Sequence, residues 1–238
     1  MIPWLDSFSL DFPSPEQALH EPNGLLAAGG GLEPERILAA YSQGIFPWYM
    51  PDDPILWWSP NPRMVLFPDE LHIPRSLAKT LRNCSYEIRF DTAFPQVMTC
   101  CAAPRKGASG TWISQAMQDA YCDLHRMGYA HSVETWIDGE LAGGLYGVAL
   151  GDVFYGESMF ALKPDASKIA FARLVPWLAG HGFRLIDCQM RTDHLTRFGG
   201  REIPRREFCT LLTEFVAVPR TPRLWHHDII HGGSGTRT

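Results

Sequence analysis

Hydrophobic and polar positions alternate most regularly between residues 131 and 190, and this stretch defines the expected architecture. Asp138-Gly139 separates the first two alternating runs, and Gly151-Asp152 separates the next two. Both dipeptides favour the tight turns of two-residue β-hairpins. The pattern therefore predicts three antiparallel strands joined by short turns.

A helix and a further strand are expected directly after these three strands. Asp165 is a favourable N-cap residue, apolar side chains then recur at helical spacing, and Gly180 and Gly182 mark the end of the helix. Pro176 is expected to kink this helix. The short apolar run of residues 184–190 predicts the next strand.

Polar residues within these strands are the main candidates for chemistry. Alternation places Tyr155, Glu157 and Met159 on one strand face, and it places Asp187 and Gln189 together on one face of the later strand. A buried carboxylate is costly unless it is paired or hydrogen-bonded. Two inward acids and an amide therefore indicate a functional site, with a structural polar network as the alternative.

Residues 1–70 are rich in proline, glycine and tryptophan, a composition that favours irregular, side-chain-packed structure. Three tryptophans, Trp48, Trp57 and Trp58, lie within a short interval, and packing between subdomains is the alternative explanation for the last two. The glycines at 29–31 lack the spacing of a nucleotide-phosphate loop, so a backbone turn is favoured there.

A basic stripe is expected on a helix over residues 74–83. Arg75, Lys79 and Arg82 recur at helical spacing and share one face. Such a stripe is usually a solvated surface, and a contact with a phosphate backbone is the alternative. Trp112 follows a glycine- and serine-rich loop just before the next predicted helix.

Composition narrows the functional classes. The chain of 238 residues is 45% hydrophobic and 20% charged, which indicates a globular protein with a sizeable core, and its net charge of −5 excludes a wholly basic nucleic-acid binder. No transmembrane-length apolar run or signal peptide is evident, so we expect a cytoplasmic protein without membrane contact. The six cysteines lack paired spacing, and no coenzyme or metal motif is found, so no cofactor and no metal are expected.

Several motifs together resemble the leucyl/phenylalanyl-tRNA-protein transferase family. They are EPNGLLAAGG (21–30), GIFPWY (44–49), ILWWSPNPR (55–63), GTWIS (110–114), HSVETW (131–136), GGLYGVALG (143–151), GESMF (156–160), ASK (166–168), IDCQ (186–189) and HL (194–195). The resemblance implies an α+β fold, in which a small mixed N-terminal domain of residues 1–70 precedes an acetyltransferase-like (GNAT-type) α/β domain of residues 71–238. From Leu224 onward we expect a loose C-terminal tail.

The resemblance also implies an activity and its residues. The activity is transfer of Leu or Phe, and less well Met, from aminoacyl-tRNA to the N-terminal Arg or Lys of acceptor proteins, which marks them for degradation. It assigns adenosine stacking to Trp48 and Trp112, the acceptor-side acid to Glu157, and a proton-handling pair to Asp187 and Gln189. Because Asp187 and Gln189 lie two positions apart, we expect a hydrogen bond between their side chains to orient the amide.

The resemblance places four apolar residues around the transferred side chain: Leu145, Phe154, Met159 and Leu174. It also favours a tRNA contact for the basic stripe of Arg75, Lys79 and Arg82. Two other classes remain as alternatives. An acyl-CoA N-acyltransferase lacks support because the usual pyrophosphate loop is absent. A non-catalytic module that binds RNA or peptide ends would not explain the inward-facing Asp187 and Gln189.

Overall fold

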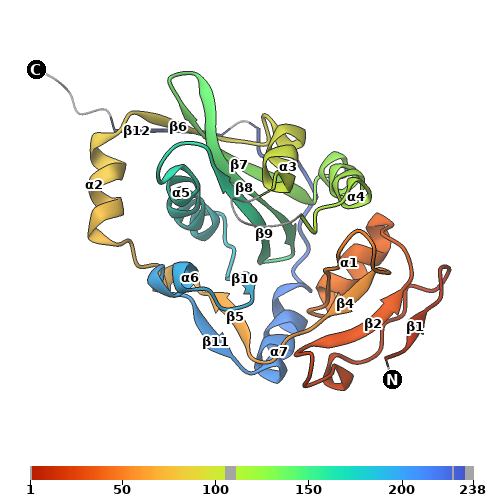
Figure 1. Ribbon diagram of the computed structural model, residues 1–238. Coiled ribbons are helices and arrows are strands. Elements are labelled where there is room, and N and C mark those ends of the chain that lie inside the picture. The colour runs from red at the N-terminus through yellow and green to blue at the C-terminus, as the bar shows by residue number, and fades with distance from the viewer. Residues whose placement is uncertain (1, 105–110, 227, 234–238) are drawn as a thin grey trace, which may run out of the picture.

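The computed structural model describes residues 2–104, 111–226 and 228–233, and an eight-stranded sheet forms its centre (Figure 1). Strands β9 and β10 pair in parallel, and every other neighbouring pair in this sheet is antiparallel. The strands, in spatial order, are β11 (Arg201–Ile203), β5 (Arg63–Leu66), β10 (Leu185–Gln189), β9 (Val153–Ala161), β8 (Glu140–Leu150), β7 (Ala130–Ile137), β6 (Tyr86–Phe90) and β12 (Ile229–Gly232).

The predicted meander is confirmed as strands β7, β8 and β9. Asp138 and Gly139 form the first turn and both have positive φ angles, which this dipeptide adopts readily. The predicted helix is α5 (Ala166–Gly180), and it crosses over from β9 to the parallel strand β10. Asp165 is its N-cap residue, but its carboxylate pairs with Lys168 and makes no capping hydrogen bond.

Helices cover both faces of the large sheet (Figure 1). Helix α5 packs on one face, and α3 (Phe94–Ala102) and α4 (Gln115–Arg126) pack on the other. Each face has its own buried apolar core. Helix α2 (Arg75–Asn83) lies beside α5 at the edge of the molecule. None of the helices in the described ranges is long and apolar enough to cross a membrane.

The N-terminal residues form a second, smaller sheet in the order β1 (Trp4–Leu5), β2 (Leu25–Gly29), β4 (Leu56–Trp58) and β3 (Phe46–Pro47). Helix α1 (Pro34–Ser42) packs beside α4, and its Tyr41 joins Trp57 and Tyr121 in the core on the α3–α4 side of the large sheet. The expectation of irregular structure over residues 1–70 was therefore wrong for these four strands, because packing against the neighbouring core stabilises short strands that composition disfavours.

The remaining elements of the described residues are two 3₁₀ turns at Pro15–Gln17 and Pro68–Glu70, α6 (Asp193–Arg197), and α7 (Arg205–Phe215), which contributes Phe208 to the shared core. The tail expected to be loose from Leu224 is ordered in β12, because that strand pairs with β6. The fold is mixed α+β, as predicted. The division at residue 70 stays a prediction.

A β-bulge interrupts the central hairpin at Glu157. Tyr146 pairs with Ser158 while the next residue, Gly147, pairs with Gly156, so Glu157 is the extra residue. Tyr155 before the bulge lies in the α3–α4 core, whereas Met159 after it packs against the α5 core. The expectation that Tyr155, Glu157 and Met159 share one face was wrong, because one extra residue reverses the alternation.

Candidate active site

A cavity of about 430 Å³ opens beside the bulge in β9. Side chains from the N-terminal sheet, the segment before α4, strands β8, β9 and β10, and helices α5 and α6 meet there. The lining residues include Trp48, Trp112, Leu145, Phe154, Glu157, Met159, Phe171, Ile186, Gln189, His194 and Leu195. Most of the candidate residues found in the sequence are thus brought to one place.

Trp48 and Trp112 line this cavity from separate parts of the chain. Trp48 is 37% exposed, and Trp58 holds its backbone, since the Trp58 indole N–H donates to the Trp48 carbonyl oxygen at 2.6 Å. Trp57 is fully buried and donates to the Gly29 carbonyl oxygen at 2.9 Å. Trp57 therefore serves core packing, whereas Trp48 offers an accessible aromatic face.

Three of the four residues expected to surround the transferred side chain line the cavity: Leu145, Phe154 and Met159. Leu174 is fully buried in the α5 core and is not a lining residue. Phe171, three positions earlier on the same helix, lines the cavity instead. Helical spacing marks both as inward positions but cannot tell which turn meets the cavity.

Glu157 is the one carboxylate that lines the cavity among the described residues. It accepts hydrogen bonds from the Tyr41 hydroxyl at 2.7 Å, the Tyr121 hydroxyl at 3.2 Å and the Gln189 side-chain amide at 2.9 Å. Burial raises its pKa to about 7, although these donors favour the charged form and partly oppose the shift, and nearby Asp187 adds to it.

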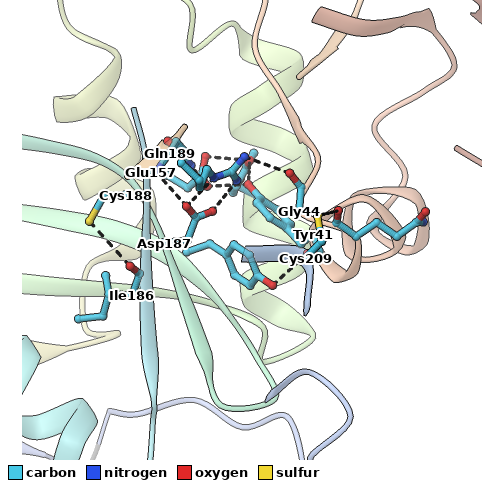
Figure 2. Close-up of polar contacts among 12 residues, drawn as sticks. Tyr41, Gly44, Glu157, Ile186, Asp187, Cys188, Gln189 and Cys209 are labelled. Atoms are coloured by element: carbon cyan, nitrogen blue, oxygen red, sulfur yellow. Dashed lines mark hydrogen bonds and ion pairs between the residues drawn. The ribbon is translucent and has the colours of Figure 1, made fainter. Parts of the chain in front are cut away.

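Asp187 does not line the cavity, and its carboxylate is paired with Arg63. Both side chains are fully buried, and the guanidinium binds the carboxylate through two hydrogen bonds, Nε to Oδ1 at 2.8 Å and Nη2 to Oδ2 at 2.6 Å. Oδ1 also accepts the backbone N–H of Gln189 at 2.9 Å. Figure 2 shows this acid close to Glu157 and Gln189, with Cys188 on the opposite side of β10.

The expected hydrogen bond between the Asp187 and Gln189 side chains is not made. Pairing of β10 with β5 shifts between these two residues, and Gln189 has a left-handed φ of 59°. The shift turns the Gln189 amide toward Glu157 and leaves only its backbone N–H on Asp187. The sequence gives no sign of this bulge, so strict alternation led to the wrong partner.

Arg63 is one of the residues of this site that sequence reasoning missed, together with Phe171, Tyr41 and Tyr121. The Nη1 of Arg63 donates to the Gly44 carbonyl oxygen at 3.0 Å, and its guanidinium lies 4.9 Å from the Phe46 ring centroid and 4.6 Å from that of Phe208. Burial alone would lower the pKa of Arg63, but the attraction of Asp187 prevails and the pKa is raised. The sequence signal that could have identified Arg63 is a single arginine at the start of the apolar run RMVL.

Cys188 is unsuited to act as a nucleophile. Burial raises the pKa of its thiol far above the ordinary value, and the neighbouring Asp187 charge adds to this effect. No cluster of histidine, cysteine or acidic side chains that could hold a metal ion occurs within the described ranges.

The basic stripe of Arg75, Lys79 and Arg82 is exposed on α2. Leu77 and Leu81 on the same helix are buried against the core, so the basic side chains face solvent. Within the described residues, no salt bridge engages any of the three. Their charge is therefore available to an external anion.

The sequence is similar to known transferases along nearly its whole length. A family model described as leucyl/phenylalanyl-tRNA protein transferase matches residues 65–213, and the model of that family's N-terminal domain matches residues 30–61. A protein of Chromobacterium violaceum named leucyl/phenylalanyl-tRNA–protein transferase is 59% identical over 98% of this chain and 100% of its own. A protein of the same name from Nitrosospira multiformis is 60% identical over 96% of this chain and 98% of its own.

Among solved structures, L-PGS from Bacillus licheniformis is similar over 71% of this chain and 54% of its own chain, with 14% sequence identity and a TM-score of 0.39. That similarity is too low to support a fold assignment.

Proposed function

The chain belongs to the leucyl/phenylalanyl-tRNA protein transferase family, and from that membership we propose how its cavity serves the reaction. It is an aminoacyltransferase that moves an aminoacyl group from tRNA to a protein. We propose that Leu and Phe are the preferred donors and Met a weaker one, and that the acceptor is an N-terminal Arg or Lys. The product would carry an N-terminal degradation signal, and the reaction would take place in the cytoplasm.

We propose that the donor end of the tRNA binds between the two cavity-lining tryptophans and the apolar slot. Trp48 and Trp112 line the cavity and offer ring faces on which the terminal adenosine can stack. Leu145, Phe154, Met159 and Phe171 provide apolar walls for the transferred side chain. One methylene in such a slot is worth roughly 1 to 3 kcal/mol, so selection among apolar side chains is expected to be moderate.

We propose that positive charge on the protein surface binds the phosphate backbone of the tRNA body. Arg75, Lys79 and Arg82 are exposed and lack salt-bridge partners among the described residues, which supports a phosphate contact for this stripe. Such contacts release counterions, so donor binding should weaken steeply as salt is added.

On the acceptor side, we propose that Glu157 attracts the cationic N-terminal residue and that Gln189 orients its α-amine. The amide nitrogen of Gln189 is committed to Glu157 at 2.9 Å, so its carbonyl oxygen is the atom that can accept a hydrogen bond from the amine. Asp187 holds the backbone of Gln189 and is screened by Arg63. Positioning the amine against an activated ester can supply roughly 7 to 11 kcal/mol of barrier reduction.

The division into residues 1–70 and 71–238 and an acetyltransferase-like second domain remain part of this proposal. The meander β7–β9, followed by a crossover through α5 to the parallel strand β10, supports it.

One observation carries the proposed function: Glu157, the one carboxylate that lines the cavity in the described part of the chain, adjoins an apolar slot that Trp48 and Trp112 also line. The test is transfer of radiolabelled Leu from Leu-tRNA to a peptide that starts with Arg. The matched controls are the same peptide with an acetylated N-terminus and one that starts with Glu, and neither should gain label. Equal transfer from leucyl-CoA, or from free Leu with ATP, would contradict a tRNA-bound donor.

A further inference from the structure

Three oxygen-bearing side chains, those of Tyr41, Tyr121 and Glu157, form a closed ring of contacts beside the cavity. The hydroxyl oxygens of Tyr41 and Tyr121 lie 2.5 Å apart, Tyr41 lies 2.7 Å from Oε1 of Glu157, and Tyr121 lies 3.2 Å from Oε2. The residues come from α1, α4 and β9, and both tyrosines are fully buried. All three contacts are within hydrogen-bond distance.

The number of hydrogens in this ring of contacts depends on the charge of Glu157. When Glu157 is ionised, the two phenolic hydrogens must serve three oxygen–oxygen contacts, so one contact always lacks a hydrogen. When Glu157 is protonated, each oxygen-bearing group can donate once around the ring and every contact is filled. The arrangement is therefore one proton short in its charged form.

We propose that Tyr41, Tyr121 and Glu157 act as one unit that takes up the proton lost by the acceptor amine and returns it to the leaving oxygen of the tRNA. This inference rests on the proposed function and deepens it. The two tyrosines act on the reaction through Glu157 and are positioning residues, whereas Glu157 meets the substrate.

The reaction balances without an external acid or base. The neutral α-amine attacks the ester carbonyl carbon, a C–N bond forms, and one N–H proton passes to Glu157. The C–O bond to the terminal ribose then breaks, its electron pair stays on the ribose oxygen, and that oxygen takes the proton back from Glu157. The unit ends in its starting charge state, ready for another cycle.

The neighbouring groups support this assignment over Asp187. Asp187 is fully buried and both its oxygens are occupied by Arg63, whereas Glu157 lines the cavity and has only neutral donors. The charged and titratable groups around Glu157 are Tyr41 on α1, Tyr121 on α4, Tyr146 on β8, and Asp187, paired with Arg63, on β10. Burial and the nearby Glu157 raise the pKa of Tyr41 and Tyr121 well above the ordinary value, so both phenols keep their hydrogens.

The test compares Tyr41→Phe and Tyr121→Phe with Tyr155→Phe as the matched control. The Tyr155 hydroxyl is also buried, and it donates to the Tyr41 carbonyl oxygen at 2.9 Å without a hydrogen bond to Glu157. Protonation of Glu157 is followed by difference infrared spectroscopy of its carboxyl group, with Glu157→Gln as the blank. Single-turnover transfer from Leu-tRNA to an Arg peptide is measured over the same pH range.

In the wild type, both the carboxyl titration and the acid limb of the transfer rate are expected near pH 7. Loss of either phenol removes a donor that favours the charged carboxylate, so both midpoints should move to higher pH and the rate below the midpoint should fall. Tyr155→Phe should leave both midpoints in place. Glu157→Gln should remove the titration of this carboxyl group, leave only the acid limb of the acceptor amine, whose ordinary pKa is about 7.7 to 8.0, and lower the saturating rate by about 10² to 10⁴.

Unchanged midpoints and rates in both folded tyrosine variants, with only the acceptor KM raised, would overturn the inference and leave Glu157 as a cation-binding group. Thermal unfolding identifies any variant that does not fold. Because the two tyrosines lie on different helices, each variant tests the prediction independently of the other. A wild type that fails to transfer Leu would refute the proposed function, whereas the infrared titration tests the proton-holding unit without any turnover.

Discussion

Two carboxylates on neighbouring strands of this protein, Asp187 fully buried and Glu157 partly buried, have opposite environments. Asp187 on β10 is bound by a guanidinium in a two-point ion pair, and both side chains are fully buried. Glu157 on β9 has no cationic partner among the described residues and accepts only from two phenols and an amide. The difference teaches that the partners of an inward acid decide its role: a cation fixes Asp187 in an ion pair, whereas the neutral donors at Glu157 do not prevent burial from raising its pKa to about 7.

The two acids also differ in their position relative to the cavity. Glu157 lines it, whereas Asp187 and Arg63 do not; their ion pair links β10 to the Gly44 carbonyl oxygen, on the segment that leads to Trp48. One acid thus meets substrate in our proposal, and the other holds the donor and acceptor sides of the site together.

The largest expected effect comes from breaking the ion pair. Arg63→Met leaves the Asp187 charge buried without a partner, which should lower the free energy of unfolding by about 3 to 5 kcal/mol. Urea denaturation at pH 7 measures this change. The double variant Arg63→Met, Asp187→Leu removes both charges and should recover most of the loss, whereas equal destabilisation in the double variant would show that the guanidinium acts mainly by packing.

Glu157→Gln, in contrast to Arg63→Met, should raise the free energy of unfolding relative to the wild type at neutral pH. The pKa of Glu157 rises from the ordinary 4.5 to about 7 in the folded protein, so the folded state binds this proton more tightly than the unfolded state does. The wild type should therefore lose stability as pH rises from about 4.5 to 7, by about 3 kcal/mol in total at 1.36 kcal/mol per pH unit.

The glutamine variant lacks this titration, so its stability relative to wild type should increase over that range and stay constant above it. Urea denaturation at pH 5 and pH 8 makes the comparison. The control is Glu35→Gln, which removes an exposed carboxylate from α1. A difference between wild type and Glu157→Gln that does not depend on pH would refute a raised pKa at Glu157.

The basic stripe on the surface of α2 provides a second contrast between paired and unpaired charge. Unlike Arg63, the three cations of the basic stripe lack salt-bridge partners among the described residues. Replacing Arg75, Lys79 and Arg82 together by Gln should raise the donor KM more than it lowers kcat, and should reduce the slope of log affinity against log salt by about 2 to 3. Arg206→Gln, an exposed change on α7, is the control. An unchanged salt slope would place the tRNA on another surface.

The smallest expected effect concerns the apolar slot. Phe171→Leu removes an aromatic wall of the cavity and should shift the ratio of Phe to Leu transfer by roughly 1 kcal/mol, about fivefold, measured with the two donor tRNAs in competition. Leu174→Ala lies in the core behind it and should cost about 2 to 5 kcal/mol of stability with little change in that ratio. A larger shift in selectivity from Leu174→Ala would reverse this assignment.

The sequence by itself determined the local structure of the central region. The turns at Asp138-Gly139 and Gly151-Asp152, the helix after Asp165 and the strand that carries Asp187 all lie where the pattern predicted them. These features depend on residues close together in the chain, such as a glycine at positive φ or apolar positions at a fixed period, so a sequence pattern is sufficient to predict them. It also identified Trp48, Trp112, Glu157 and Gln189, which meet at one cavity.

Only the tertiary structure decided the partners within the site. Two bulges, at Glu157 and between Asp187 and Gln189, reversed the side-chain alternation that the sequence suggested. Arg63 binds Asp187 across 124 positions of the chain, and Tyr41 and Tyr121 reach Glu157 from two separate helices. Strand register and long-range pairing depend on how complete surfaces pack against one another, and no local pattern of residues encodes that fit.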